Sequence, residues 1–292
     1  MELLDGRKIS NDIKNEIAQS VSKIKESGMR PPHLAAVIVG NDGASMTYVG
    51  AKVKACDFVG FQSTLVKLPE STPELSLIKK IHALNEDSKI DGFIVQLPLP
   101  NHIDEQKILM AINPDKDVDG FHPTNVGKLS LGLPTFISAT PFGIIELLKR
   151  YNVKTSGKHV VVIGRSNIVG RPLSILMSQK RISGNATVTV AHSRTQNLTD
   201  LTIKADIIVA ALGIPEFLKA DMIKSDSVVI DVGITRVNDS STKKGYKIVG
   251  DVDFENVSKK TSYITPVPGG VGPMTIAMLL KNTLQAYNKK HA

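Results

Sequence analysis

Apolar positions along this chain follow two spacings, one typical of helices and one typical of buried strands. From Ile9 onward they recur every three or four residues, until Gly28 and a Pro-Pro pair interrupt the pattern. This spacing predicts a first helix. Residues 33–40 then form an almost unbroken apolar run, which predicts a buried strand. A helix that carries Tyr48 and Lys52 is expected directly after it.

Helical and strand-like segments alternate over the rest of the chain, in two series. Buried apolar strands that are separated by helices indicate a parallel sheet covered on both faces. The expected strands are Phe61–Leu68, Ile90–Gln96, His159–Gly164, Thr187–Ala191, Ile207–Ala210 and Val228–Val232. The expected helices are Glu74–Asn85, Glu105–Ile112, Phe142–Arg150 and Met274–Tyr287.

The length of the chain, 292 residues, exceeds the usual size of a single domain and predicts two. The stretch 115–140 between the two series is rich in Gly, Pro and Asn and is expected to consist mainly of loops. The final helix is apolar on nearly all sides at its start, so we expect it to be buried, packed back against the first domain.

Composition narrows the class of protein. Hydrophobic residues make up 41% and charged residues 22%, as in ordinary soluble globular proteins. The net charge of +8 fits a polyanionic ligand, but the lysines are dispersed and only 4% of residues are aromatic, which disfavours nucleic-acid binding. The chain start lacks a signal-peptide pattern, and no apolar run is long enough to span a membrane. The single cysteine, Cys56, favours a reducing cytoplasm and is expected to be a buried structural thiol.

A glycine-containing turn after a strand predicts a dinucleotide site. Gly164, Ser166 and Gly170 follow the strand at 159–164 and open a helix, where backbone amides and a helix N-terminus can receive a pyrophosphate. The next strand normally ends in Asp or Glu when NAD is bound, but here it ends in His192-Ser193-Arg194. Serine and arginine can bind a 2′-phosphate that a carboxylate would repel, and Arg165 adds a second cation. The pattern therefore favours NADP over NAD.

Tyr48 and Lys52 are four residues apart, so on a helix they share one face. Gln96 stands at the end of the strand expected at 90–96. Taken alone, each could be an ordinary surface or strand-end residue. Together they are candidates for one catalytic site.

The acidic run Asp115-Lys116-Asp117-Val118-Asp119-Gly120 matches the first half of a calcium loop. The twelfth position is Val126, where a bidentate Glu is required, so no EF-hand is expected. The run is either a charged turn or a loop that presents one acid to a cleft. The seven histidines show no metal-ligand spacing, and no metal is expected.

The segment Ile264–Thr275 contains three prolines and three glycines within ten residues, which makes a stiff loop that exposes its backbone. Such a loop can line a cleft or lie flat against a ring, or it can be a simple turn between domains.

These motifs together resemble the bifunctional methylenetetrahydrofolate dehydrogenase/cyclohydrolase family over essentially the whole chain. The matching segments are Asp5-Gly6, Tyr48-x-x-x-Lys52, Val95-Gln96-Leu97-Pro98-Leu99-Pro100, 114–127, 164–172, Val229–Ile234, Gly250–Glu255 and 265–275. The resemblance implies an α/β fold with two domains and a cleft between them. The first is an N-terminal folate-binding catalytic domain at 1–139, completed by 273–292, and the second a Rossmann-type NADP-binding domain at 140–272.

The resemblance also implies roles for particular residues and a setting for the enzyme. The catalytic residues would be Lys52, Tyr48, Gln96 and Asp119. Folate would be bound by Tyr48, Lys52, Gln96 and Asp119 together with Val95, Leu97 and Pro268-Gly269-Gly270. NADP would be bound by Gly164, Arg165, Ser166, Ser193, Arg194 and Ile234. The enzyme would be a cytoplasmic homodimer that serves one-carbon metabolism and purine biosynthesis, binding a folate substrate but neither nucleic acid nor membrane. Two departures from the family pattern, at Ala139 and Glu216, lie outside the catalytic set.

The chemistry explains these residue types. Hydride loss from the methylene carbon leaves a cation, which a permanently charged ammonium would oppose. We therefore hypothesise that burial lowers the pKa of Lys52, so that its neutral amine accepts a proton from water during ring opening. Gln96 can bond either form of the amine, and the Asp119 carboxylate can accept two N–H bonds from the pterin.

Three other readings remain open. A monofunctional dehydrogenase would not need Tyr48, Lys52 and Gln96 together. A related NADP oxidoreductase acting on a shikimate-like acid would not need Asp119 with the Pro-Gly loop. A basic nucleic-acid-binding protein would need stacking aromatic residues.

Overall fold

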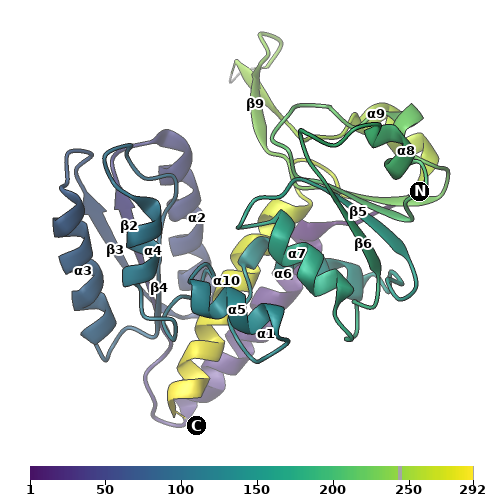
Figure 1. Ribbon diagram of the computed structural model, residues 1–292. Helices are drawn as coiled ribbons and strands as arrows, with labels where there is room; N and C mark the ends of the chain where they lie inside the picture. Colours follow the sequence, from purple (N-terminus) through teal and green to yellow (C-terminus); the bar gives the residue numbers. More distant parts are fainter. Residues whose placement is uncertain (243–244, 292) are drawn as a thin grey trace. The chain divides into compact units, whose positions relative to one another are not determined.

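The computed structural model describes residues 1–242 and 245–291, apart from the side chain of Ala44. The chain divides into two compact units (Figure 1). The three-strand unit comprises Asn11–Ala139 and Ile276–Ala292, and the six-strand unit comprises Met1–Ser10 and Thr140–Thr275. The predicted cleft between domains stays a prediction.

The first residues of the chain group with the six-strand unit rather than with the segment that follows them. The reason is backbone pairing, because strand β1 (Glu2–Leu3) lies parallel to strand β11 (Thr261–Ile264). This grouping differs from the expected domain boundaries at residues 1–10 and 273–275. As functional domain boundaries, 1–139 with 273–292 and 140–272 stay predictions.

The three-strand unit is built on a parallel sheet with the order β3-β2-β4. Strand β2, the first of the three in sequence, is therefore central. The chain goes from β2 to β3 on one side of it and then to β4 on the other side. The strands are β2 (His33–Val39), β3 (Gln62–Leu68) and β4 (Gly92–Val95). The helices are α1 (Gly6–Glu26, which starts in the other unit), α2 (Gly43–Val59), α3 (Glu74–Glu86), α4 (Glu105–Ala111) and α5 (Pro123–Ser130).

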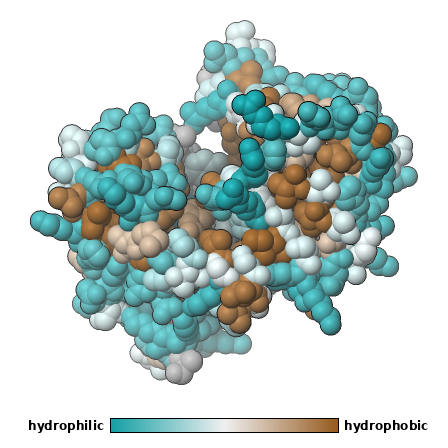
Figure 2. All heavy atoms as spheres, in the orientation of Figure 1, coloured by the Kyte–Doolittle hydropathy of each residue, from teal (hydrophilic) through white to brown (hydrophobic). Residues whose placement is uncertain are grey.

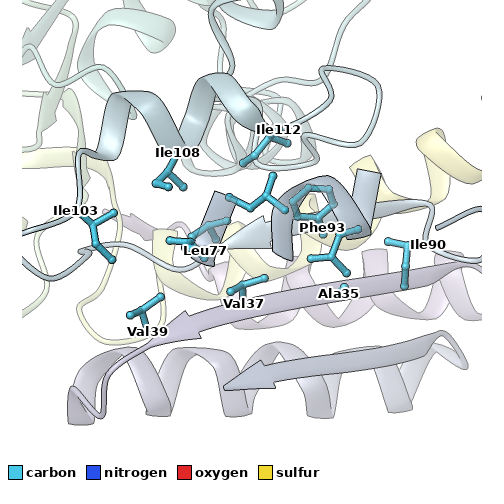
Figure 3. Packing of buried hydrophobic residues seen from close by; sticks show 12 residues of the cluster. Ala35, Val37, Val39, Leu77, Ile90, Phe93, Ile103, Ile108 and Ile112 are labelled. Carbon is cyan, nitrogen blue, oxygen red and sulfur yellow. The ribbon is translucent and has the colours of Figure 1, made fainter. Parts of the chain in front are cut away.

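One face of this sheet is covered by α3 and α4. Val37 on β2 and Phe93 on β4 are fully buried with Leu77 on α3 and Ile108 on α4 in one hydrophobic cluster (Figure 3). The spacing of the apolar residues along each helix places them on the side that meets the sheet. This packing fixes the carboxyl end of β4, where Gln96 begins the next loop.

The six-strand sheet is parallel throughout, with the order β1-β11-β8-β7-β5-β6. From β5 the chain goes first to β6 on one side and then to β7 on the other, so the order reverses between β5 and β7. Ligands of doubly wound sheets bind at the carboxyl ends of the strands at this switch point. The remaining strands are β5 (His159–Ile163), β6 (Thr187–Ala191), β7 (Ile207–Ala210) and β8 (Ser227–Asp231).

Both faces of the six-strand sheet are buried at its central strands β5, β7 and β8. Val161 and Ile208 lie in a cluster on one face, and their neighbours Val160 and Val209 are fully buried as well. Continuous burial of this kind is typical of a parallel sheet with helices on both sides. The helices of this unit are α6 (Ala139–Arg150), α7 (Gly170–Ser178), α8 (Leu198–Thr202), α9 (Phe254–Val257) and α10 (Val271–His291, which ends in the other unit). It also contains the single 3-10 turns η1 (Ala220–Met222) and η2 (Ser258–Lys260). An antiparallel hairpin consists of β9 (Thr235–Asn238) and β10 (Tyr246–Val249).

The predicted α/β fold with parallel sheets is confirmed, with two differences. The stretch 115–140 contains the helix α5, which has Pro at its start and the side chain of His122 as its cap, so the expectation of loops was partly wrong. The strands β1, β9, β10 and β11 were not predicted. The final helix is buried as expected, with Tyr287 1% exposed and the Arg30 guanidinium 5.4 Å from the centre of its ring.

The face seen in Figure 2 is mainly hydrophilic, with hydrophobic residues in separate patches. Among the helices of the described residues, none combines the length and the apolar character that a membrane crossing requires.

Candidate active site and cofactor site

The three-strand unit brings Lys52 and Gln96 into direct contact. Lys52 Nζ donates a hydrogen bond to Gln96 Oε1 over 3.0 Å, and Gln96 Nε2 donates to the Leu97 carbonyl over 2.7 Å. The backbone N–H of Gln96 donates to the Val37 carbonyl, which anchors the residue to the end of the central strand. The amide oxygen is therefore fixed toward the amine.

Helix α2 positions the amine. Its first turn is capped by the carboxylate of Asp42, which accepts from the Ser45 N–H over 2.7 Å, and Gly60 ends it with a left-handed φ of 79°. Caps of this kind fix where a helix starts and stops. Lys52 therefore lies in the middle of a helix whose two ends are both held.

Asp119 enters the same site from a loop that runs beside β4. Phe93 on β4 bridges to Asp117, whose carboxylate accepts from the N–H of His122 over 2.7 Å and from Asn125 Nδ2 over 2.8 Å. Gly120 has a φ of +72°, and a side chain there would press on the backbone of Ile137 and Ser138. The loop is thus held on both sides of Asp119.

Burial and charge shift the pKa values of both ionisable groups. Desolvation lowers the pKa of Lys52, and the charge of Asp119 partly offsets this. Desolvation raises the pKa of Asp119 to about 6, with Lys52 opposing and Asp117 adding to the rise. A lowered pKa increases the fraction of neutral amine, the form that general base catalysis requires.

The other residues predicted for this site lie around the pair in different ways. Tyr48 is one helical turn before Lys52 and 38% exposed, and burial raises the pKa of its phenol. The side chain of Val95 is 3% exposed and belongs to the aliphatic core, so only its backbone could face a ligand. Leu97 is half-buried and contributes its carbonyl to Gln96.

In the six-strand unit, the turn after β5 requires its glycines. Gly164 has a φ of +129°, and a Cβ there would collide with the Ala211 carbonyl after β7. A Cβ at Gly170 would collide with the Gly164 carbonyl. The backbone is therefore packed closely at the switch point, which leaves the cradle that a pyrophosphate needs. The residues present fit a dinucleotide.

Polar and cationic side chains surround this turn. The hydroxyl of Ser166 accepts from the N–H of Val169 over 3.1 Å at the start of α7. Arg165, Ser193 and Arg194 are all exposed, and the Arg194 N–H donates to His192 Nδ1 over 3.2 Å, which tightens the turn after β6. Exposed cations at a strand end suit a phosphate group.

The proline-glycine loop and Ile234 lie near one another within the six-strand unit. A methyl group at Gly272 would be 3.3 Å from Ile234 Cδ1. The Gly269 carbonyl accepts from the Arg7 N–H over 3.0 Å, and a Cβ at Gly6 would collide with the Gly270 carbonyl. The Asp5-Gly6 motif is thus explained by close packing of α1 against this loop.

Several positioning residues were not predicted. Asn282, fully buried on α10, donates to the carbonyls of Val118 and Ile137 over 2.8 and 2.9 Å and so holds the loop of Asp119. Asp117 was hidden by the repetition of the acidic run, since nothing in the sequence tells which of its acids is buried. Ile168 and Ile214 are 40% and 49% exposed in the loops after β5 and β7, where apolar side chains can cover flat rings.

Cys56 is buried, as was predicted for a structural thiol, and burial raises the pKa of its thiol to about 12, which disfavours the reactive thiolate. Within the described part of the chain, no group of three His, Cys, Asp or Glu side chains is arranged to hold a metal ion. At the two departures from the family pattern, Ala139 is buried at the start of α6 and Glu216 is exposed in the loop after β7.

Two family profiles match this chain. Residues 4–119 match the catalytic domain of tetrahydrofolate dehydrogenase/cyclohydrolase, and residues 138–291 match its NAD(P)-binding domain. The chain is 68% identical over 292 residues to "Bifunctional protein FolD" of Flavobacterium johnsoniae, covering 100% of this chain and 99% of that protein.

Solved structures agree with the sequence matches. The crystal structure of the bifunctional FolD methylenetetrahydrofolate dehydrogenase/cyclohydrolase from Campylobacter jejuni is 48% identical, with a TM-score of 0.93 and 99% of each chain covered. The FolD of Trypanosoma brucei, solved with NADP cofactor and inhibitor, is 39% identical with a TM-score of 0.94, covering 99% of this chain and 98% of that one. The chain therefore belongs to the tetrahydrofolate dehydrogenase/cyclohydrolase family.

Proposed function

We propose that this chain oxidises 5,10-methylenetetrahydrofolate to 5,10-methenyltetrahydrofolate with NADP and then hydrolyses that product to 10-formyltetrahydrofolate. Family membership over both matched regions supports both activities. The observation that carries the proposal is the bonded pair of Lys52 and Gln96, in which an amine with a lowered pKa faces a neutral acceptor and interacts with Asp119.

In the oxidation, a hydride leaves the carbon that bridges N5 and N10 of the folate and the carbon becomes a methenyl cation. Bound NADP supplies the hydride acceptor. A fixed ammonium beside the new cation would raise the energy of this step, because like charges repel. Desolvation of Lys52 reduces that repulsion by favouring the neutral amine.

In the hydrolysis, water adds to the methenyl carbon and the bond from that carbon to N5 breaks, leaving a formyl group on N10. One proton of the water ends on N5 and the other is released. Lys52 Nζ accepts a proton from the attacking water, which increases the nucleophilicity of its oxygen. Gln96 holds the amine through its carboxamide oxygen without adding charge.

The remaining predicted residues orient the substrate. Tyr48 shapes the pocket one turn from Lys52. Ionised Asp119 accepts two N–H bonds from the pterin edge, because a carboxylate presents only acceptors. Pro268, Gly269 and Gly270 would complete the folate site, but only Pro268 is exposed, because the two glycines are buried against the start of α1.

For the cofactor, we assign the pyrophosphate to the turn of Gly164, Arg165 and Ser166 and the 2′-phosphate to Ser193 and Arg194 with Arg165. The close backbone packing at Gly164 supports the first assignment, and the absence of a carboxylate from the end of β6 supports the second. Ile234 would face the nicotinamide half.

A cytoplasmic homodimer in one-carbon metabolism completes the proposal, with 10-formyltetrahydrofolate available for purine biosynthesis. The single buried cysteine supports a reducing compartment. Sedimentation velocity of the purified chain tests the dimer.

A monofunctional dehydrogenase is disfavoured, since hydride transfer alone gives no reason for the Lys52–Gln96 pair. Methylenetetrahydrofolate is mixed with the purified chain and NADP, and separately NAD, while the absorbance of the methenyl product is followed. We expect the methenyl product to form faster with NADP and then to decay at an enzyme-dependent rate. Formation without enzyme-dependent decay would leave only the dehydrogenase, and no formation would contradict the proposal.

A further inference from the structure

Two aspartates without a role in the chemistry above are buried at the carboxyl edge of the six-strand sheet. Asp231 ends β8 in the Val229–Ile234 motif and is 3% exposed, and Asp251, in the Gly250–Glu255 motif, is fully buried. Buried carboxylates are costly unless they are hydrogen-bonded. The groups that they bond therefore indicate what they do.

Asp231 holds the loop that follows its own strand and the loop that carries Asp251. Its Oδ1 accepts from the N–H of Gly233 over 2.9 Å and of Asp251 over 2.8 Å, and its Oδ2 accepts from the Val252 N–H over 3.0 Å. Gly233 directly precedes Ile234, which was assigned to the cofactor. The carboxylate thus fixes the backbone next to that residue.

Asp251 holds the loop after β7 in the same way. Its Oδ2 accepts from the N–H of Leu212 over 2.6 Å and of Gly213 over 2.9 Å. Leu212 follows Ala211, whose carbonyl packs against Gly164 at the switch point. The loop fixed by Asp251 is therefore the one that closes the pyrophosphate turn.

The two aspartates are also fitted to each other through glycines. A Cβ at Gly233 would collide with Asp251 Oδ1, and a Cβ at Gly250 would collide with the carboxylate of Asp231. Burial together with the charge of Asp251 raises the pKa of Asp231 to about 6, against the lowering effect of its three backbone bonds. Among the described residues, Asp251 Oδ1 has no hydrogen-bond partner.

We propose that Asp231 and Asp251 are positioning residues for NADP, a pair of carboxylates that sets cofactor affinity by fixing the loops after β7 and β8 without touching the cofactor. This inference rests on the proposed function. Neither carboxylate is exposed enough to bind a ligand. The amides held by Asp251 follow Ala211, which packs against Gly164 of the cofactor turn, and one amide held by Asp231 precedes Ile234.

The test uses the two activities as internal controls for each other, because hydrolysis of added methenyltetrahydrofolate needs no NADP. D251A removes the acceptor of two amides, and we expect the KM for NADP in the oxidation to rise about tenfold or more. The rate of methenyl hydrolysis should stay within about twofold of the parent, because this reaction needs no NADP and the loss of two loop hydrogen bonds is small on the scale of the whole protein.

D251N is the conservative partner of this variant. The asparagine oxygen can accept from both Leu212 and Gly213, and its amide nitrogen takes the place of the unpartnered Oδ1. We expect D251N to recover most of the NADP affinity that D251A loses. In D231N, one oxygen must replace two acceptors, so we expect a KM for NADP between those of D251N and D251A.

D206A is the matched control, since Asp206 accepts a backbone N–H from His159 over 2.8 Å at the opposite, amino edge of the same sheet. It should lower the melting temperature and leave the KM for NADP unchanged. The inference is overturned if D251A keeps the parental KM for NADP, or if D206A raises that KM as much as D251A does. If D251A does not fold, the inference is tested by the KM for NADP of the parent, D251N and D231N. It is supported if D231N has a higher KM than D251N and the parent, and overturned if all three values are equal. Failure of the proposed function is separate, because the parent would then lack one or both activities.

Discussion

His33 begins the central strand of the three-strand sheet, and His159 begins the matching strand of the six-strand sheet. His33 Nε2 lies 2.9 Å from Thr64 Oγ1 on β3, and His159 Nε2 lies 2.9 Å from Thr189 Oγ1 on β6. In each sheet the threonine pairs with the strand residue two positions after the histidine. The amino edges of the two sheets are therefore built alike.

A second similarity involves the strand on the other side, β4 beside β2 and β7 beside β5. Asp91 immediately precedes β4 and accepts from the His33 N–H, and Asp206 immediately precedes β7 and accepts from the His159 N–H, both over 2.8 Å. The cation differs: Arg30 binds Asp91 with two bonds of 2.7 Å, whereas Lys224 binds Asp206 with one of 2.6 Å.

At the carboxyl edges the sheets differ completely. The three-strand sheet presents Lys52 and Asp119, whose pKa values are shifted toward neutral pH by burial. The six-strand sheet presents exposed cations and closely packed glycines around Gly164. One parallel architecture can therefore support both proposed sites, and the loops at the carboxyl edge would determine whether a site transfers protons or holds phosphates.

The largest effect is expected from K52M, which removes the amine from the carboxyl edge of the three-strand sheet. Methenyl hydrolysis should fall about 10³-fold or more, as loss of a general base implies, while hydride transfer remains measurable. K54M, which changes an exposed lysine on the same helix, should leave both rates within about twofold. Equal loss of hydrolysis and folate binding would instead make Lys52 a positioning residue.

At the amino edges, D91A should cost about 3 kcal/mol of unfolding free energy, because it leaves the guanidinium of Arg30 without its buried partner. D206A should cost less, about 1 kcal/mol, since Lys224 and Asp206 are both partly exposed. Chemical denaturation measures both values, and equal losses would show that the two edges are not distinguished by burial.

The Asp206 contribution also depends on pH. Its bond with Lys224 lowers the folded-state pKa of the Asp206 carboxyl, so the contribution is present above the unfolded pKa and is lost as the pH falls through the folded one. Unfolding at several acidic pH values should show D206A approaching the parent.

D119N should raise the KM for the folate about thirtyfold at pH 7.5, the size expected for weakening a charge-assisted contact by about 2 kcal/mol. Since the pKa of Asp119 is about 6, parental folate affinity should fall as the pH drops below that value, whereas D119N should show no such change. D115N, on the same loop but exposed and paired with Lys289, is the control. Matching pH profiles in the parent and D119N would remove Asp119 from the pterin contact.

The smallest effect on ligand binding is expected at the exposed cations of the other carboxyl edge. R194A should raise the KM for NADP about tenfold and leave the KM for NAD unchanged, because only NADP carries the 2′-phosphate. K180A, at an exposed lysine just beyond α7, is the matched control. A parallel change for both cofactors would place Arg194 away from the 2′-phosphate.

Features of the fold and of the two sites that depend on a local sequence pattern could be predicted from the sequence. The apolar runs gave the strands that flank both switch points, and the spacing of Tyr48 and Lys52 gave their shared helix face. The glycines of the turn after β5 were identified because each is needed locally.

Contacts that depend on residues far apart in the chain could not be predicted. Strand β1 is only two residues long and exists by pairing with β11, whose sequence has no long apolar run. Asn282 binds the loop of Asp119 through the Val118 carbonyl, 164 positions earlier in the chain. The likeness of the two amino edges was equally hidden, since its parts are short and widely separated.

The central claim is that Lys52 is held partly neutral beside Gln96, and its titration in the folded protein tests this most directly. Carbon-detected NMR of labelled lysine side chains, with the Lys52 signal assigned from its loss in K52M, gives the pKa of the amine. If Lys52 is held partly neutral, its pKa lies below the 10.5 of an ordinary lysine. A value at or above 10.5 would contradict it.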